Sequence, residues 1–182
     1  MNQSNETVVF GGGCFWCYEA IFSRLKGVGK VVSGYAGGTK ENPTYDEVCT
    51  GRTENAEVIQ ITFDPSVISF KTLLEVFFNV HDPTVKNRQG ADEGSQYRSI
   101  ILFTTPEQKI AAETYIAKLT ADHIFPNPIV TEIKPLGEKG FYEAEKYHQK
   151  YFDTNREQPY CEFVISPKMT KFMKAYKNLL KN

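Results

Sequence analysis

The chain has 182 residues, of which 41% are hydrophobic and 24% charged. This composition is typical of a soluble globular protein and excludes disordered and collagen-like classes. Lys and Arg number 21 against 22 Asp and Glu, so the net charge is too small to attract a nucleic-acid backbone or an anionic membrane surface. We therefore expect no nucleic acid and no membrane among the partners of the protein.

The length and the cysteine content narrow the class further. A chain of this size can bury one substantial core, and no linker, repeat or low-complexity stretch divides it, so we expect a single domain over residues 1–182. The first ten residues have no apolar run of the kind found in a secretory signal, and no segment is as long as a membrane-spanning helix. We expect a cytoplasmic protein.

The four cysteines of the chain are too few for a disulfide scaffold, which favours redox or nucleophilic roles for them. They are Cys14, Cys17, Cys49 and Cys161.

The first half of the chain alternates between strand and helix patterns. Residues 7–10 predict a strand, which the glycines at 11–13 connect to a helix with apolar residues at helical spacing. A second strand is predicted over residues 30–35, followed by a long loop over residues 37–55. Residues 57–63 alternate between apolar and polar and predict a half-buried strand, with Glu57 on the apolar face.

The second half continues the alternation. Ser69 is a candidate N-cap for an apolar helix over residues 70–78, and a loop over residues 81–96 follows it. Residues 97–103 predict a strand, and Thr105 with Pro106 opens a helix that extends to about residue 119. A last core strand is predicted over residues 129–133. The chain then becomes aromatic and irregular before a terminal helix that Ser166 would cap. The pattern indicates an α/β or α+β domain.

The strongest local motif is Gly11-Gly12-Gly13-Cys14-Phe15-Trp16-Cys17, which places Cys14 where a strand meets the start of a helix. Free N–H groups and the positive end of the helix dipole stabilise a thiolate there and lower the thiol pKa. The alternative is a buried packing cysteine, which leaves the glycine run and the Phe15-Trp16 pair without a purpose. We predict that Cys14 is a nucleophile.

Two further residues have open interpretations. Cys17 follows Cys14 by three residues, which fits either a dithiol pair of the thioredoxin kind or a buried helix cysteine. Glu57 lies on an apolar strand face, where desolvation would raise its pKa and make it a proton donor near neutral pH. The alternative for Glu57 is that it ends the strand and faces water.

A zinc-binding module is a competing hypothesis from another class. It would use Cys14, Cys17 and two of the three histidines, His81, His123 and His148. Structural zinc sites are usually built from two closely spaced ligand pairs. No second pair of that kind exists in the sequence, so we expect no metal.

Several segments in order resemble the peptide methionine sulfoxide reductases of the A type, and the resemblance spans nearly the whole chain. The matching segments are Gly12-Gly13-Cys14-Phe15-Trp16, Gly34-Tyr35-Ala36-Gly37-Gly38, Asn42-Pro43-Thr44-Tyr45, Val48-Cys49-Thr50-Gly51, Ala56-Glu57-Val58, Asn87-Arg88-Gln89-Gly90, Gln96-Tyr97-Arg98-Ser99 and Ala144-Glu145-Lys146-Tyr147-His148-Gln149. The chain departs from the family at Glu54-Asn55, where Gly-His is usual, so no role is carried over for that histidine.

The resemblance implies a fold and an activity. The fold would be α+β, a two-layer sandwich with a mixed, mostly antiparallel sheet (ferredoxin-like core) and an irregular C-terminal segment. The activity would be reduction, without a cofactor, of the S epimer of methionine sulfoxide, both in oxidised proteins and as the free amino acid.

The resemblance also implies roles for individual residues. Cys14 would attack the sulfoxide sulfur and be left as a sulfenic acid, while Glu57 would protonate the departing oxygen. Phe15 and Trp16 would form the apolar pocket for the substrate methyl group. The sulfoxide oxygen would be held through hydrogen bonds by Tyr45, Tyr97 and Asp92.

A second thiol would then resolve the sulfenic acid as a disulfide, which thioredoxin would reduce. We favour Cys161 over Cys17 for this step and also consider direct attack by thioredoxin. Cys49 is expected to be structural. The competing enzyme class is a thioredoxin-like dithiol oxidoreductase that uses Cys14 and Cys17, but it leaves Glu57 and the aromatic pair without a function.

Overall fold

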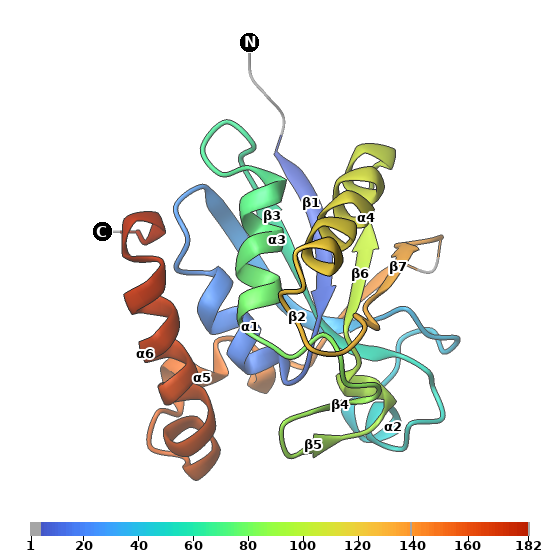
Figure 1. Cartoon of the computed structure of the whole chain (residues 1–182). Coiled ribbons are helices and arrows are strands. Elements are labelled where there is room, and N and C mark those ends of the chain that lie inside the picture. Colours follow the sequence, from blue (N-terminus) through green and yellow to red (C-terminus); the bar gives the residue numbers. More distant parts are fainter. Residues whose placement is uncertain (1–4, 139, 182) are drawn as a thin grey trace.

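The computed structural model describes residues 5–138 and 140–181. Within these residues a six-stranded sheet has the strand order β7-β6-β1-β3-β2-β8 (Figure 1). Neighbouring strands are antiparallel, except that β6 and β7 are parallel. The fold is therefore mixed α+β. The strands of this sheet are β1 (Glu6–Gly11), β2 (Val28–Ala36), β3 (Ala56–Phe63), β6 (Ile100–Phe103), β7 (Glu132–Pro135) and β8 (Phe141–Glu143).

Helices and a small second sheet complete the described residues. The α-helices are α1 (Phe15–Phe22), α2 (Tyr45–Cys49), α3 (Phe70–Asn79), α4 (Pro106–Ala121), α5 (Tyr151–Thr154) and α6 (Ser166–Ala175). A π-helical turn, η3 (Cys161–Ile165), leads into α6, and three short 3₁₀ helices are η1 (Ser95–Tyr97), η2 (Lys146–His148) and η4 (Lys177–Leu179). The second sheet pairs β4 (Arg88–Gln89) with β5 (Asp92–Glu93).

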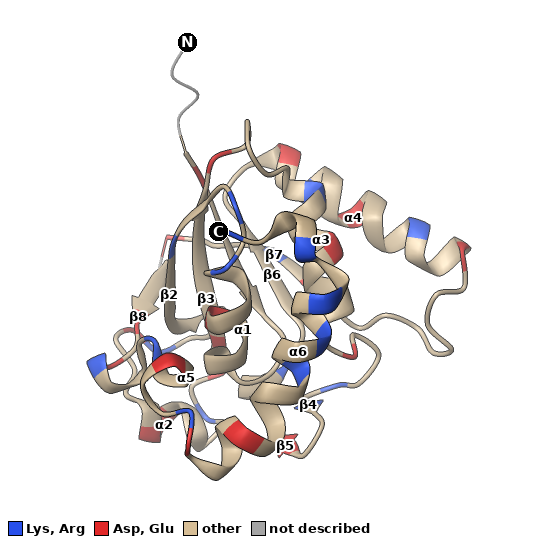
Figure 2. Ribbon diagram, turned by 90° about the vertical axis from the view of Figure 1, so that its left-hand side faces the viewer, with Lys and Arg blue, Asp and Glu red and all other residues tan. Residues whose placement is uncertain are grey.

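The main core lies between the sheet and the helices on one of its faces. Figure 2 shows α3, α4 and α6 on one side of strands β2 and β3. Phe10 of β1 contacts Phe77 of α3 with ring centroids 4.7 Å apart, and Ile59 and Ile61 of β3 are buried in the same cluster. A smaller cluster on the opposite face includes Val58. The burial of both faces of β3 explains how a strand can carry a buried carboxyl among apolar neighbours.

Several sequence predictions are confirmed. The side chain of Ser69 accepts the N–H of Thr72 at the start of α3. Thr105 accepts the N–H of Gln108, with Pro106 in the first turn of α4. Residues 57–63 lie within β3. No helix in the described part of the chain is long and apolar enough to cross a membrane.

Other predictions differ from the structure. The loop over residues 37–55 contains α2, which Thr44 and Glu47 open with a capping box. The last predicted strand is shifted, because the N–H of Val130 pairs with Pro83 and β7 begins only at Glu132. Ser166 does not cap a helix: its hydroxyl donates to the carbonyl of Cys161 within a helical segment that has already begun.

Candidate active site

A small cavity of about 200 Å³ gathers most of the residues that the sequence singles out. It lies where α1, α2, β3 and β5 meet. The residues that line it are Cys14, Phe15, Trp16, Tyr45, Glu57, Asp92, Tyr97 and Tyr160. Each predicted catalytic and substrate-binding residue is in this set, whereas Cys17 and Cys161 are not.

The glycine run places Cys14 at the start of α1. Cys14 has extended backbone angles and occupies the N-cap position of the helix. Gly13 has a φ of +121°, which side chains disfavour. A Cβ atom on Gly12 would lie 2.2 Å from the hydroxyl of Tyr18. These glycines are therefore required for the tight turn that brings the thiol into the cavity.

The environment of Cys14 does not lower its thiol pKa, contrary to the sequence prediction. Desolvation by burial raises the pKa well above its ordinary value, and the negative charge of Glu57 raises it further. The hydroxyl of Tyr160 and the backbone N–H of Trp16 act in the opposite direction. The helix terminus thus stabilises the thiolate and lowers the pKa, but the removal of water from the sulfur raises the pKa by more.

Glu57 is buried, so of the two interpretations of the strand pattern the one with a desolvated acid is correct. Its side chain is 2% exposed, and its Oε2 accepts the backbone N–H of Phe15 at 3.2 Å. Burial raises its pKa to about 8, and the charge of Asp92 adds to the effect. Glu57 is therefore mainly protonated at neutral pH, and in that state it carries none of the charge that raises the pKa of Cys14.

Trp16 is held on two sides by the segment after β8. Its ring stacks on Tyr151 with centroids 3.7 Å apart and an interplanar angle of 10°. Its Nε1 donates to Nδ1 of His148 at 3.0 Å. Burial lowers the pKa of His148, so the ring stays neutral, with its proton on Nε2. From the sequence, His148 was considered only as a possible zinc ligand, and Tyr151 had no predicted role.

Glu145 fixes the start of α2, which carries Tyr45. One carboxyl oxygen of Glu145 accepts the backbone N–H of Tyr45 at 2.8 Å, and the other accepts the hydroxyl of Tyr35 at 2.8 Å. The ring of Tyr45 also contacts that of His148, with centroids 4.6 Å apart. The segment that contains Glu145 and His148 thus holds both Tyr45 and Trp16, which form two walls of the cavity.

Tyr160 is the lining residue that the sequence analysis missed. Its hydroxyl donates to Oδ2 of Asp92 at 2.6 Å, and its presence beside Cys14 acts to lower the pKa of that thiol. Tyr160 and Asp92 are separated by 68 residues, so no local pattern connects them. In this segment the sequence had suggested a role only for the thiol of the adjacent Cys161.

All four cysteines are free, and their environments differ. Cys17 is a buried residue of α1, and Cys161 is buried within η3. Cys49 is exposed at the end of α2, so it does not have the structural role of a buried packing residue. The short helix turns this position outward. Cys17 lies outside the lining of the Cys14 cavity, which gives the dithiol hypothesis no support.

The zinc hypothesis also finds no support. Among residues 5–138 and 140–181, no cluster of three or more His, Cys, Asp or Glu side chains could hold a metal ion. His81 instead lies within hydrogen-bond distance of the carbonyl of Phe77 and the hydroxyl of Ser99.

A thiol, a protonated carboxyl and an aromatic wall in one cavity define a cysteine-dependent enzyme with a mixed α+β fold. The sequence profile of the family described as peptide methionine sulfoxide reductase matches residues 6–180. The chain belongs to this family.

Relatives and solved structures agree with this assignment. The chain is 54% identical over 176 residues to "Peptide methionine sulfoxide reductase MsrA" of a Nitratiruptor species, covering 97% of this chain and 99% of that protein. It is 56% identical over 171 residues to the protein of the same name from Sulfolobus acidocaldarius, covering 94% and 95%. It is also similar to the structure of reduced Mxr1 from Saccharomyces cerevisiae, with a TM-score of 0.78 and 32% identity over 88% of this chain and 91% of that one.

Proposed function

We propose that this chain reduces the S epimer of methionine sulfoxide, free or in proteins, through Cys14 and Glu57. The observation that carries the proposal is that the thiol and a buried, mainly protonated carboxyl line one small cavity with an aromatic wall. A sulfoxide is a polarised but uncharged group, so a donor on one side and an apolar surface on the other suit it.

In the proposed mechanism, protonated Glu57 gives its proton to the substrate oxygen, and the proton that leaves the Cys14 thiol then restores the carboxyl. The thiolate attacks the sulfoxide sulfur, the sulfur–oxygen bond of the substrate breaks, and the oxygen ends as a hydroxyl on the sulfur of Cys14. Methionine sulfur gains two electrons and Cys14 sulfur loses two. The Phe15 N–H bond keeps the Glu57 carboxyl at the start of α1, beside the nucleophile.

We assign the remaining lining residues to binding. Phe15 and Trp16 would contact the substrate methyl group, and Tyr45, Tyr97 and Asp92 would hold the sulfoxide oxygen. Burial raises the pKa of both Tyr45 and Tyr97, so each keeps its hydroxyl proton and can donate a hydrogen bond. Tyr160 joins this group through Asp92.

Regeneration would require a second thiol and then thioredoxin. Cys161 or Cys17 would displace the sulfenic hydroxyl as water and form a disulfide with Cys14. The yeast relative Mxr1 has a structure in complex with Trx2, and thioredoxin is the reductant that we propose here.

We also propose a ferredoxin-like core for this fold, within one catalytic domain of a two-layer type. The antiparallel order β6-β1-β3-β2, with α1 after β1 and α3 after β3, supports it. A cytoplasmic location stays a proposal that rests on the sequence.

A single-turnover assay without reductant tests the function. The enzyme should convert methionine (S)-sulfoxide to methionine and leave the R epimer, and Cys14→Ser should abolish the conversion. Cys49→Ser, at the exposed thiol, is the matched control and should retain full activity. Turnover by Cys14→Ser at the normal rate would remove Cys14 from the mechanism.

A further inference from the structure

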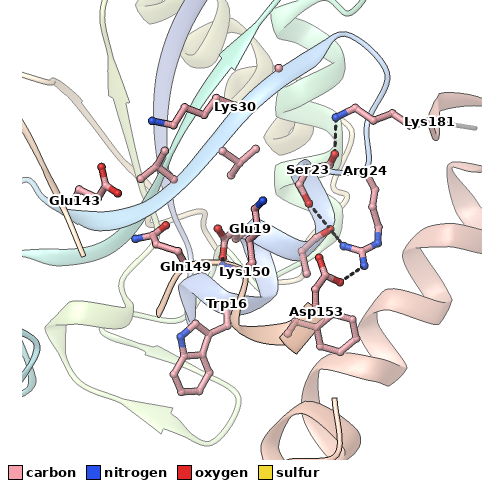
Figure 3. A pocket seen from close by; sticks show the side chains of 15 residues that line it. Trp16, Glu19, Ser23, Arg24, Lys30, Glu143, Gln149, Lys150, Asp153 and Lys181 are labelled. Atoms are coloured by element: carbon pink, nitrogen blue, oxygen red, sulfur yellow. Dashed lines mark hydrogen bonds and ion pairs between the residues drawn. The ribbon is translucent and has the colours of Figure 1, made fainter. Parts of the chain in front are cut away.

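A second, larger cavity of about 690 Å³ adjoins the Cys14 cavity. It lies between α1, strand β2 and the segment around α5, with Trp16 at one end (Figure 3). Trp16 also lines the Cys14 cavity. Among the larger cavities in the described part of the chain, no other shares a lining residue with the Cys14 cavity. The two cavities therefore meet at the ring of Trp16.

One wall of this cavity is the outer edge of β2. Strand β8 pairs with β2 only over residues 34–36. At Ser33 the backbone N–H of Ala144 still donates to the carbonyl at 2.9 Å. The side-chain amide of Gln149 completes the pairing: its oxygen accepts the Ser33 N–H at 3.0 Å, and its nitrogen donates to the Ser33 carbonyl at 2.9 Å. Beyond Ser33, no strand of the described residues pairs with this edge.

The alternation of a strand identifies which backbone groups face the cavity. Since Ser33 directs its N–H and C=O outward, the next residue to do so is Val31, two positions earlier. Gly29 and Lys30 are exposed, Val31 is half-buried, and all three line the cavity. The edge thus offers unpaired backbone groups beside a cavity that leads to Trp16.

We propose that this cavity binds the polypeptide backbone next to the methionine sulfoxide, as an added strand on the outer edge of β2. The inference rests on the proposed function. Oxidised methionine occurs in many sequences, so an enzyme that repairs it gains most from contacts to the backbone, which every sequence shares. Val31 would supply the central pair of main-chain hydrogen bonds.

The charges around the cavity are consistent with a varied substrate. Lys30, Lys150 and Glu143 line the cavity, and Arg24 is paired with Asp153 at 2.6 Å (Figure 3). Both signs are present, so the lining imposes no single-sign preference on the side chains of the bound segment.

The first test changes the substrate and leaves the enzyme intact. Peptides with a central methionine (S)-sulfoxide are methylated at one backbone nitrogen at a time, and kcat/KM is measured for each. Methylation at alternate residues on one side of the sulfoxide should lower kcat/KM about two- to tenfold, the value of one net hydrogen bond. A uniform effect, or none, overturns the proposal.

The second test changes Val31. Val31→Pro removes the outward N–H at an edge position, where proline is tolerated, and Val31→Ala is the matched control that keeps it. Val31→Pro should lower kcat/KM for the peptide about two- to tenfold relative to Val31→Ala and leave free methionine sulfoxide unchanged. An equal loss for both substrates, or no loss for the peptide, contradicts the proposal that the peptide backbone binds along the edge of β2. Inactivity of the unaltered enzyme on free methionine sulfoxide would instead refute the proposed function.

Discussion

The carboxyl of Glu57 is hydrogen-bonded to the backbone N–H of Phe15, the residue that follows Cys14. This bond joins the first residues of β3 to the first turn of α1, although the two positions are 42 residues apart. It accounts for the position of a buried acid beside a thiol, because the carboxyl satisfies one of the free N–H groups at the helix start.

Glu57→Gln should separate acid catalysis from positioning. The amide oxygen of Gln can still accept the Phe15 N–H, so the geometry should survive, but the side chain has no proton to transfer. We expect the single-turnover rate with methionine (S)-sulfoxide to fall about 10²- to 10⁴-fold, the usual contribution of a positioned acid. Substrate affinity, measured by quenching of Trp16 fluorescence, should change little. An unchanged rate would remove Glu57 from the chemistry.

The raised pKa of Glu57 also predicts how stability depends on pH. The folded protein holds this proton up to about pH 8, whereas the ordinary pKa of the side chain is 4.5. Its contribution therefore lowers the free energy of unfolding as pH rises from about 4.5 through 8. Each tenfold difference in the acid constant is worth about 1.4 kcal/mol.

Urea denaturation at pH 5, 7 and 9 can check this effect. Wild type should lose stability relative to Glu57→Gln as the pH rises to about 8, and the difference should then stay constant. Glu19→Gln is the comparison variant, because burial raises the pKa of Glu19 only to about 7. The difference in the free energy of unfolding between Glu19→Gln and wild type should stop increasing near pH 7. A constant difference between wild type and Glu57→Gln at all three pH values would contradict the assignment.

The features that could be predicted from the sequence are those that depend on residues close together in the chain. Ser69, the Thr105-Pro106 pair and the alternation after Glu57 each act through neighbours a few residues away. The capping box of Thr44 and Glu47 has such a signal too, but the surrounding glycines and proline favoured a loop. Contacts between distant positions, such as Tyr160 with Asp92, have no signal of this kind and depend on how the whole chain packs.

His148→Phe should loosen the aromatic wall without removing it. Phenylalanine keeps an aromatic ring beside Phe15 and Tyr45, but the N–H of Trp16 loses its acceptor. An unpaired buried donor costs about 1–3 kcal/mol, so we expect KM to rise at least several-fold with a smaller change in kcat. Trp16 is the single tryptophan of the chain, so its emission reports the change directly. An unaltered KM and emission spectrum would show that the bond to His148 is dispensable.

Cys161 should resolve the sulfenic acid on Cys14. Neither Cys161 nor Cys17 lines the cavity, so one of them must move. Cys161 directly follows Tyr160, which lines the cavity together with Cys14, and it opens a π-helical turn. Such turns are rare and often mark functional sites. Cys17 lies in the first turn of α1, where its N–H donates to the carbonyl of Cys14, so its movement would disrupt the helix that positions the nucleophile.

Mass-spectrometric mapping of the disulfide after one turnover checks this assignment. Wild type and Cys17→Ser should both form the Cys14–Cys161 bond, while Cys161→Ser should accumulate Cys14 with one added oxygen atom. Burial raises the pKa of Cys17 to about 11, which leaves little thiolate to attack and slows any substitute reaction. A Cys14–Cys17 bond formed at the wild-type rate in Cys161→Ser would identify Cys17 as the resolving thiol.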